Sequence, residues 1–170
     1  LGAITALGNE KVELNDIHKR ALKLVRDLQG RGSGADLAAS LKGGCLSYQI
    51  ATNEDETHAA MKPLPQPPSL SLCYAGYKTP TGEVLARVAE ARCGQETHFD
   101  KLYAIMGACA ERAITEMKAQ DWNALALSLN EYQGFMRELG VSDTKIEHIV
   151  ASAHKALAAK ISGSGLGDCV

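Results

Sequence analysis

The chain has 170 residues, of which 45% are hydrophobic, and its formal net charge at pH 7 is −2. This length and apolar content allow one ordinary domain, or two small lobes, with a real hydrophobic core. The charge gives no electrostatic reason to bind nucleic acid or an anionic membrane, the basic residues are scattered, and no segment could span a bilayer. We therefore expect neither a nucleic-acid nor a membrane partner.

The two ends and the cysteines indicate the kind of protein from which the chain comes. Residues 1–8 lack an initiator Met and a basic segment, so they are no signal peptide, and the chain ends as abruptly at Cys169-Val170. We expect a piece of a longer protein.

The five cysteines are irregularly spaced, with no C-x-x-C pair and no metal-ligand spacing. Reduced core thiols in a cytoplasmic protein are the expectation.

Apolar periodicity and the positions of glycine and proline predict the elements in chain order. They are a helix over 13–28, a short helix over 35–41, a strand over 45–50, a proline-rich surface connection over 52–68, a strand over 70–75, helices over 81–92, 97–119, 121–139 and 142–156, and a strand over 157–161. Ser33, Thr79 and Ser142 are the expected helix caps. Few strands among many helices favour an α+β fold over a doubly wound sheet.

Two glycine-rich elements suggest a site for phosphoryl groups. Near the end of the chain, Gly163, Gly165 and Gly167 alternate with other residues, two serines among the neighbours. Such a backbone can turn its amide N–H groups toward a bound anion, most often a phosphate. A second glycine-rich stretch, residues 31–36, opens the short helix. Plain turns or linkers are the alternative for either stretch alone.

Candidate chemical groups lie in or near these elements. Asp36 stands in the first turn of the short helix, where it could accept a proton from a substrate hydroxyl, although an ordinary helix-start acid is the alternative. Lys78 and Thr79 lie between a strand and a helix, where the lysine could reach a phosphate or stay solvated. Arg31 could pair with an anionic group or be a surface cation.

Together these stretches resemble the GHMP kinase superfamily (galactose, homoserine, mevalonate and phosphomevalonate kinases). The segment from Gly32 to Gly44 looks like the family segment that carries an aspartate and ends in a glycine pair. The segment from Lys160 to Cys169 looks like the family's third, C-terminal glycine motif. Leu139-Gly140-Val141-Ser142 is similar to the "LGVS" turn of mevalonate kinases, the branch that the chain resembles most.

The resemblance implies a fold and a site. The fold would be of the GHMP kinase type, with part of the left-handed βαβ N-terminal lobe over 1–60, a ferredoxin-like C-terminal lobe, truncated at its end, over 61–170, and the site between them. Asp36 would be the catalytic base. The remaining residues implied to bind phosphate or substrate are Ser33, Gly34, Arg31, Lys78, Thr79, Gly163, Ser164, Gly165 and Gly167.

The implied function is that of an ATP-dependent small-molecule kinase with ATP and Mg²⁺ as cofactors. Its partner would be a small-molecule alcohol, mevalonate first, in isoprenoid precursor synthesis, and a homodimer is left open. Phosphomevalonate is the runner-up acceptor, because Arg31, Lys42 and Lys78 could supply charge for its phosphate. A sugar or sugar phosphate comes third, and a non-catalytic metabolite-binding homologue is the alternative from another class.

Two departures from the family bear on these expectations. The family's second motif, a loop that binds the ATP triphosphate, would lie before Leu1, so we expect this chain alone to be inactive. Mevalonate kinases also carry a magnesium-binding glutamate eleven residues before the base. Here that position is Val25, and the nearest acid is Asp27. The segment therefore predicts no metal ligand of its own.

Overall fold

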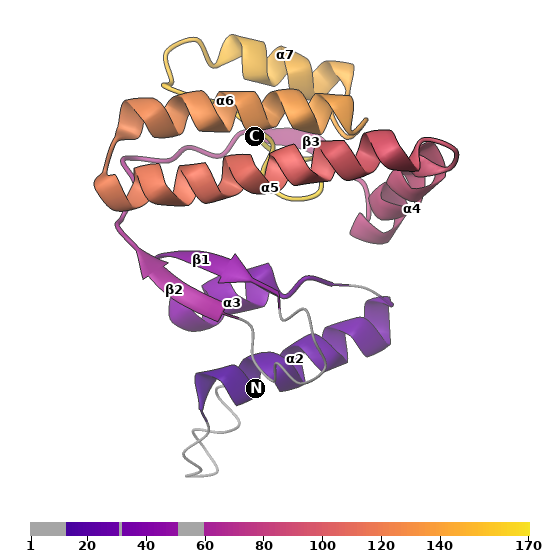
Figure 1. Cartoon of the computed structure of the whole chain (residues 1–170), viewed down its shortest axis with the longest axis vertical. Helices are drawn as coiled ribbons and strands as arrows, with labels where there is room; N and C mark the ends of the chain where they lie inside the picture. The colour runs from indigo at the N-terminus through magenta and orange to yellow at the C-terminus, as the bar shows by residue number, and fades with distance from the viewer. Residues whose placement is uncertain (1–12, 31, 51–59) are drawn as a thin grey trace. The chain divides into compact units, whose positions relative to one another are not determined.

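A computed structural model describes residues 13–30, 32–50 and 60–170 (Figure 1). The chain divides into two compact units, with the boundary between Gln66 and Pro67. Each unit is described below by itself, and the assignment of family lobes to 1–60 and 61–170 stays a prediction. Within the described ranges, every helix is too short or too polar to span a bilayer.

The first unit packs two helices with a β-hairpin. Its elements are α2 (Leu14–Gln29), α3 (Ala35–Lys42), β1 (Cys45–Gln49) and β2 (Ala60–Leu64). The strands are antiparallel, and α3 contacts both α2 and β1. Ile17 of α2 and Ala38 of α3 are buried where the two helices pack against each other, whereas Leu24 and Leu28 of α2 are exposed.

Strand β2 corrects the expectation of a surface connection over 52–68. The prolines suggested a connection, yet Pro63 pairs with Leu46 in the antiparallel register. Proline lacks an N–H and is tolerated in a strand at the edge of a sheet. The hairpin has only two strands within the described residues, so β2 is such an edge. The polar part of the expected connection, residues 52–59, lies outside the described residues.

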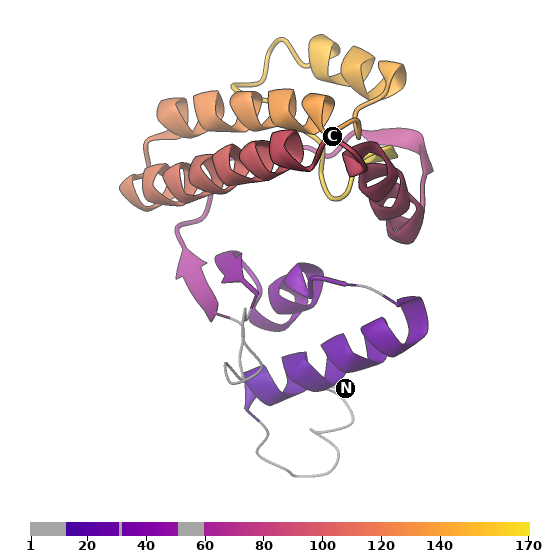
Figure 2. The same cartoon turned by 45° about the vertical axis from the view of Figure 1, so that its right-hand side comes forward.

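The second unit is mainly helical, with one two-stranded sheet. Its elements are β3 (Tyr74–Lys78), α4 (Thr81–Arg92), α5 (Glu96–Ala119), α6 (Trp122–Glu138), α7 (Thr144–Ser152) and β4 (Gly167–Cys169). In both views α6 lies between α5 and α7 (Figures 1 and 2). Strands β3 and β4 pair antiparallel although they are far apart in the sequence.

One hydrophobic core holds the second unit together. It joins four helices, the turn after α6 and the run before the glycine loop through Val84, Val88, Phe99, Leu102, Met106, Met136, Val141, Ile146 and Ile161. These positions recur at helical spacing in α4 and α5, which is the pattern that predicted the helices. The mixture of helices and short strands confirms the α+β prediction.

Three local expectations in this unit are wrong. Residues 157–161 form no strand, because Ile161 is buried but its backbone N–H donates to the Gln133 side chain instead of to a strand. Pro80, without a side-chain bond, stands at the N-cap of α4 in place of Thr79. Asp143, not Ser142, caps α7 by accepting from two backbone amides.

The expected strand over 70–75 lies further along, at Tyr74–Lys78, where it can pair with β4. The cysteines also differ from expectation. All five are free thiols, but Cys73 and Cys93 are exposed and only Cys109 is fully buried. A short apolar run does not by itself show which of its residues reach the core.

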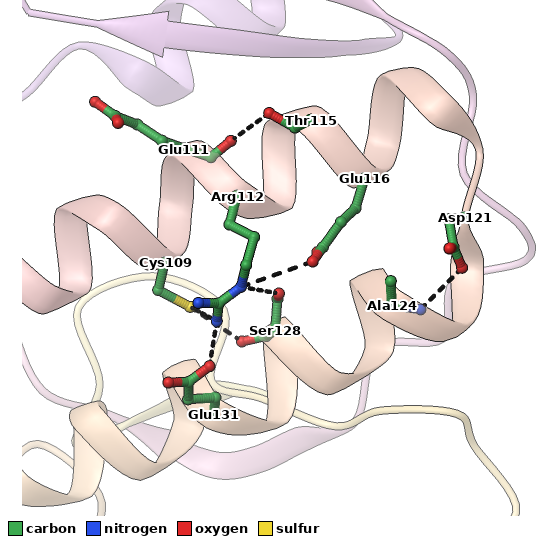
Figure 3. A network of polar contacts seen from close by, with 9 residues as sticks. All are labelled: Cys109, Glu111, Arg112, Thr115, Glu116, Asp121, Ala124, Ser128 and Glu131. Atoms are coloured by element: carbon green, nitrogen blue, oxygen red, sulfur yellow. Dashed lines mark hydrogen bonds and ion pairs between the residues drawn. The ribbon is translucent and has the colours of Figure 1, made fainter.

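Arg112 joins α5 to α6 through a small polar network (Figure 3). Its Nε donates to Ser128 Oγ over 3.0 Å and lies 3.7 Å from a carboxylate oxygen of Glu116. Its Nη2 donates to Cys109 Sγ over 3.4 Å and also to Glu131. One side chain of α5 therefore contacts two side chains of α6 in addition to the apolar packing.

Candidate functional site

The turn that carries Asp36 is held by a buried histidine. Gly34, at the N-cap of α3, has φ of +83°, and a Cβ there would lie 2.9 Å from His18 Nε2. His18 is buried, and its Nε2 donates to the Gly34 carbonyl oxygen over 2.8 Å. Glycine is therefore required at 34 both for its backbone conformation and for the close approach of α2.

Strand β1 also holds this turn, through the side chain of Tyr48. The Tyr48 hydroxyl donates to the Ser33 carbonyl oxygen over 2.6 Å, and the rings of Tyr48 and His18 are 5.6 Å apart. Ser33 Oγ accepts from the Ala35 N–H over 3.4 Å, which supports the start of α3 although Gly34 is the N-cap residue.

Asp36 itself is exposed in the first turn of α3. Burial raises the pKa of Tyr48, a nearby Arg26 opposes this, and the charge of Asp36 raises that pKa further. The carboxylate thus lies close enough to Tyr48 to influence it, yet it remains open to solvent. An exposed, negatively charged oxygen at a helix start can accept a proton or a hydrogen bond from a ligand hydroxyl.

The glycine loop of the second unit, residues 162–167, is shaped by two close approaches. A Cβ on Gly165 (φ +89°) would collide with the Val141 carbonyl oxygen and lie 2.7 Å from Val141 Cβ. A Cβ on Gly167 (φ +117°) would lie 2.7 Å from the Tyr77 carbonyl oxygen. Gly163 (φ +96°) has no atom within 4 Å of such a Cβ. Glycine is thus needed for space at 165 and 167, and for backbone conformation at all three positions.

Backbone bonds fasten this loop to its neighbours. The Leu166 N–H donates to the Val141 oxygen over 2.8 Å, and the Thr79 N–H donates to the Leu166 oxygen over 3.2 Å. Val141 belongs to the Leu139–Ser142 turn that was recognised in the sequence. The turn and the glycine loop are therefore neighbours in space.

Lys78 pairs with an acid of β4, directly after this loop. Its Nζ lies 2.7 Å from Asp168 Oδ2, with 62% and 41% of the two side chains exposed. The hydrogen bond to Asp168, together with the charge of that carboxylate, raises the pKa of Lys78. Leu166 and Asp168 also have positive φ, of 51° and 64°, a conformation that L-residues other than glycine adopt rarely.

A buried glutamine sets the start of the loop. The Ile161 N–H donates to Gln133 Oε1 over 2.9 Å. Gln133 Nε2 donates to Ser142 Oγ and to Glu147 Oε1, each over 3.1 Å. Arg137 Nη2 donates to the other oxygen of Glu147 over 2.6 Å. Helices α6 and α7 and the residue before the loop therefore share one hydrogen-bond network.

A second contact joins α7 to strand β3. The Tyr77 hydroxyl donates to the carboxylate of Asp143, the residue that caps α7. Burial, with this bond and the carboxylate charge, raises the pKa of Tyr77 to about 12. Because Tyr77 also contacts Gly167, β3 is fixed between α7 and the glycine loop.

The structure groups the predicted site residues within each unit. Lys78 and Thr79 lie beside the glycine loop with Gly163, Ser164, Gly165 and Gly167, which belong to the same unit. Ser33, Gly34 and Asp36 form one turn in the first unit. Arg31 lies outside the described residues. The roles of all these residues in catalysis or binding stay predictions.

Sequence reasoning missed His18, Tyr48, Gln133 and Asp168. His18 stands four residues after Leu14, on the apolar stripe of α2, so its burial was visible in the helical spacing. The other three act through partners that are distant in sequence, and no local pattern reveals them.

The described residues fit a phosphate better than a metal ion. The glycine loop has the open, left-handed backbone that anion-binding amides require. Among residues 13–30, 32–50 and 60–170, no group of three His, Cys, Asp or Glu side chains is placed to hold a metal ion. Val25 presents a methyl group toward Gly32, not a carboxylate. We therefore assign no Mg²⁺ ligand among these described residues.

The comparisons with known proteins agree with this geometry. Residues 113–170 match the family model described as "GHMP kinases C terminal". Mevalonate kinase of Aeropyrum pernix is 24% identical over 168 residues, covering 98% of this chain and 51% of that protein. Mevalonate kinase of Pyrococcus furiosus is 28% identical over 177 residues, covering 100% of this chain and 51% of that protein. The chain spans about half the length of these curated relatives.

Solved structures show the same likeness. L. major mevalonate kinase in complex with R-mevalonate aligns with a TM-score of 0.81 at 24% identity, over 98% of this chain and 51% of that one. The Lin0012 protein of Listeria innocua aligns with a TM-score of 0.83 at 20% identity, over 94% of this chain and 52% of that one. The chain therefore has the GHMP kinase fold, with the family's C-terminal domain matched at residues 113–170, and it is similar to mevalonate kinases along its length.

Proposed function

We propose that the protein containing this chain is an ATP-dependent kinase that phosphorylates an alcohol, with mevalonate as the acceptor. The observation that carries the proposal is the glycine loop, which lies in the segment that matches the kinase family and is fastened to Val141 and Thr79. Similarity to mevalonate kinases along the whole chain supports the acceptor.

In the proposed reaction, Asp36 takes the proton of the acceptor hydroxyl. Its exposed carboxylate stands at a helix start, within reach of a ligand. His18 and Tyr48 bind backbone carbonyl oxygens just before Asp36, so the backbone that carries the carboxylate is held in place. Gly34 and Ser33 contribute to binding through this same turn.

The glycine loop stabilises negative charge on the transferred phosphoryl group through its backbone amides. Phosphoryl transfer depends mainly on positioning and on electrostatic stabilisation, so a preformed loop suits it. Thr79, beside the loop, and Ser164, within it, contribute to binding. When bound, ATP would supply the γ-phosphoryl group and leave as ADP.

A coupled assay for ADP release tests the proposal. The full-length protein is given ATP with mevalonate, phosphomevalonate or one of a panel of sugars. We expect turnover with mevalonate above all other acceptors. Preference for another alcohol would retain a kinase but overturn the acceptor. Failure to form ADP with any acceptor would overturn the kinase assignment.

A metabolite-binding role without catalysis is the second candidate. Val25, where mevalonate kinases carry a glutamate, is the observation that favours it. Isothermal titration of mevalonate into the protein separates the two candidates. Binding without ADP release supports this second role, and ADP release rules it out.

A further inference from the structure

Two side-chain amides of α6 bind the run of residues that leads into the glycine loop. Asn130 Nδ2 donates to the Leu157 carbonyl oxygen over 3.3 Å, and Asn130 Oδ1 accepts from the Ala159 N–H over 3.2 Å. Gln133 Oε1 accepts from the Ile161 N–H over 2.9 Å. The bound residues therefore alternate along the run, as they would along one edge of a β-strand.

The spacing of the two amides suits this pairing. Asn130 and Gln133 are three residues apart on α6, so their side chains lie on one face of the helix, about 5–6 Å from each other. Two residues of an extended chain cover about 6.5 Å, which side chains of this length can match. Helix α6 thus takes the place of a partner strand for a run whose sequence predicts a strand.

Gln133 holds the last residue of this run before the loop. Ile161 has no exposed surface, so its backbone groups need partners within the protein. Its carbonyl oxygen accepts from the Lys160 ammonium, which lies over the Tyr132 ring, 5.6 Å from the ring centre. Gln133 is itself buried, and two bonds from its Nε2 to other partners keep its oxygen turned toward Ile161.

We propose that Asn130 and Gln133 are positioning residues, which set the glycine loop in the conformation that binds a phosphate group. The proposal rests on the proposed function, which assigns the phosphoryl group to this loop. Both side chains act through the backbone and not by contact with the ligand. Ile161 directly precedes the loop, so a shift at Ile161 moves the loop backbone. Loss of the Gln133 oxygen leaves a buried N–H without its acceptor, and the run must move to find another.

The test compares the full-length protein with three variants. Gln133→Met keeps the length of the side chain but removes the acceptor oxygen, and Asn130→Leu removes the bonds at the earlier part of the run. Asn130 is exposed, so its variant decides the test if Gln133→Met does not fold. Arg112→Ala is the control, because Arg112 bonds to Ser128 and Glu131 of α6 and not to the run. Urea unfolding identifies conditions in which each variant is folded.

The first readout is the affinity for inorganic phosphate, followed by the NMR shifts of the loop amides. We expect Gln133→Met to weaken phosphate binding by about tenfold, which corresponds to the loss of one buried hydrogen bond. Asn130→Leu should weaken it by about threefold, because Asn130 acts further from the loop. Arg112→Ala should stay within about twofold of the unaltered protein. An unchanged affinity in a folded Gln133→Met or Asn130→Leu, or an equal loss in Arg112→Ala, would overturn the proposal.

This readout needs no turnover, so it separates failure of the inference from failure of the proposed function. If the unaltered protein binds no phosphate at the loop, the inference is overturned, whereas the ADP-release assay decides the proposed function separately.

The second readout is the separation of kcat from KM in that assay. We expect Gln133→Met to lower kcat and to leave the KM for mevalonate nearly unchanged, because the loop acts on the transferred phosphoryl group and not on the acceptor. A raised KM for mevalonate with an unchanged kcat would contradict the proposal.

Discussion

Gly165 and Gly163 share a left-handed backbone but differ in their surroundings. Alanine at 163 meets nothing within 4 Å, so it should cost only backbone strain, about 1–2 kcal/mol. Alanine at 165 meets Val141 as well, and should cost more than about 3 kcal/mol because the turn or the loop must move. Urea unfolding of Gly165→Ala beside Gly163→Ala measures the difference. Equal losses would show that the loop does not pack on Val141 as described.

Glu147 should make the second unit sensitive to acid. The bond from Arg137 lowers the pKa of Glu147 below its ordinary value of 4.5, and bonds from Ser142 and Gln133 lower it further against the effect of burial. Because the folded-state pKa is the lower one, folding favours the charged form. This stabilisation is present above about pH 4.5 and is lost as the pH falls through the folded-state pKa.

We therefore expect Glu147→Gln to reduce stability at neutral pH and to weaken the loss of stability below about pH 4.5. Urea unfolding at a series of pH values is the measurement. Glu138→Gln, which alters an exposed acid of α6, should leave the acid limb unchanged. If the free energy of unfolding of Glu147→Gln falls as steeply below about pH 4.5 as that of the unaltered protein, the assigned network is contradicted.

At the scale of elements, Arg112 is the main polar link between α5 and α6 (Figure 3). Arg112→Ala leaves Ser128 and the mostly buried Glu116 without this donor, so it should cost about 1–3 kcal/mol in the free energy of unfolding. Arg92→Ala removes one exposed ion pair and should cost less than Arg112→Ala. Thermal or urea unfolding compares them. A loss for Arg112→Ala no larger than for Arg92→Ala would show that apolar packing alone joins the two helices.

The helices could be predicted from sequence better than the strands. The expected helix over 13–28 is found at Leu14–Gln29, because four turns of apolar spacing leave few alternatives. The prolines of strand β2 predict a connection, and only the pairing of Pro63 with Leu46 shows that the segment is a strand. The apolar run before the glycine loop predicts a strand. In the structure, however, the Ile161 N–H donates to the Gln133 side chain, so it does not pair with a neighbouring strand.

The candidate site was predictable where its signal is local. Gly165 and Asp36 could be singled out because glycine spacing and a helix-start acid are visible in a few residues. The Lys78–Asp168 pair could not be predicted, because it depends on the pairing of β3 with β4, which lie far apart in the sequence. Tyr48 likewise reaches Ser33 only after the hairpin has formed.

At the scale of the whole molecule, each unit provides one part of the proposed chemistry. The first unit holds the turn with Asp36, and the second holds the glycine loop on a core of its own. The chain spans about half of the mevalonate kinases that it matches. Activity is therefore a property to be measured on the full-length protein.

The central claim is that Asp36 is the base of a kinase reaction on mevalonate. The most direct measurement is the rate of ADP release from ATP and mevalonate by the full-length protein, by Asp36→Asn and by Asp16→Asn. Asp16 is the matched control, because it is also an acid in the first turn of a helix of the same unit. We expect a drop in kcat of about 10²-fold or more for Asp36→Asn and little change for Asp16→Asn. A kcat for Asp36→Asn within about twofold of the unaltered enzyme would contradict the account.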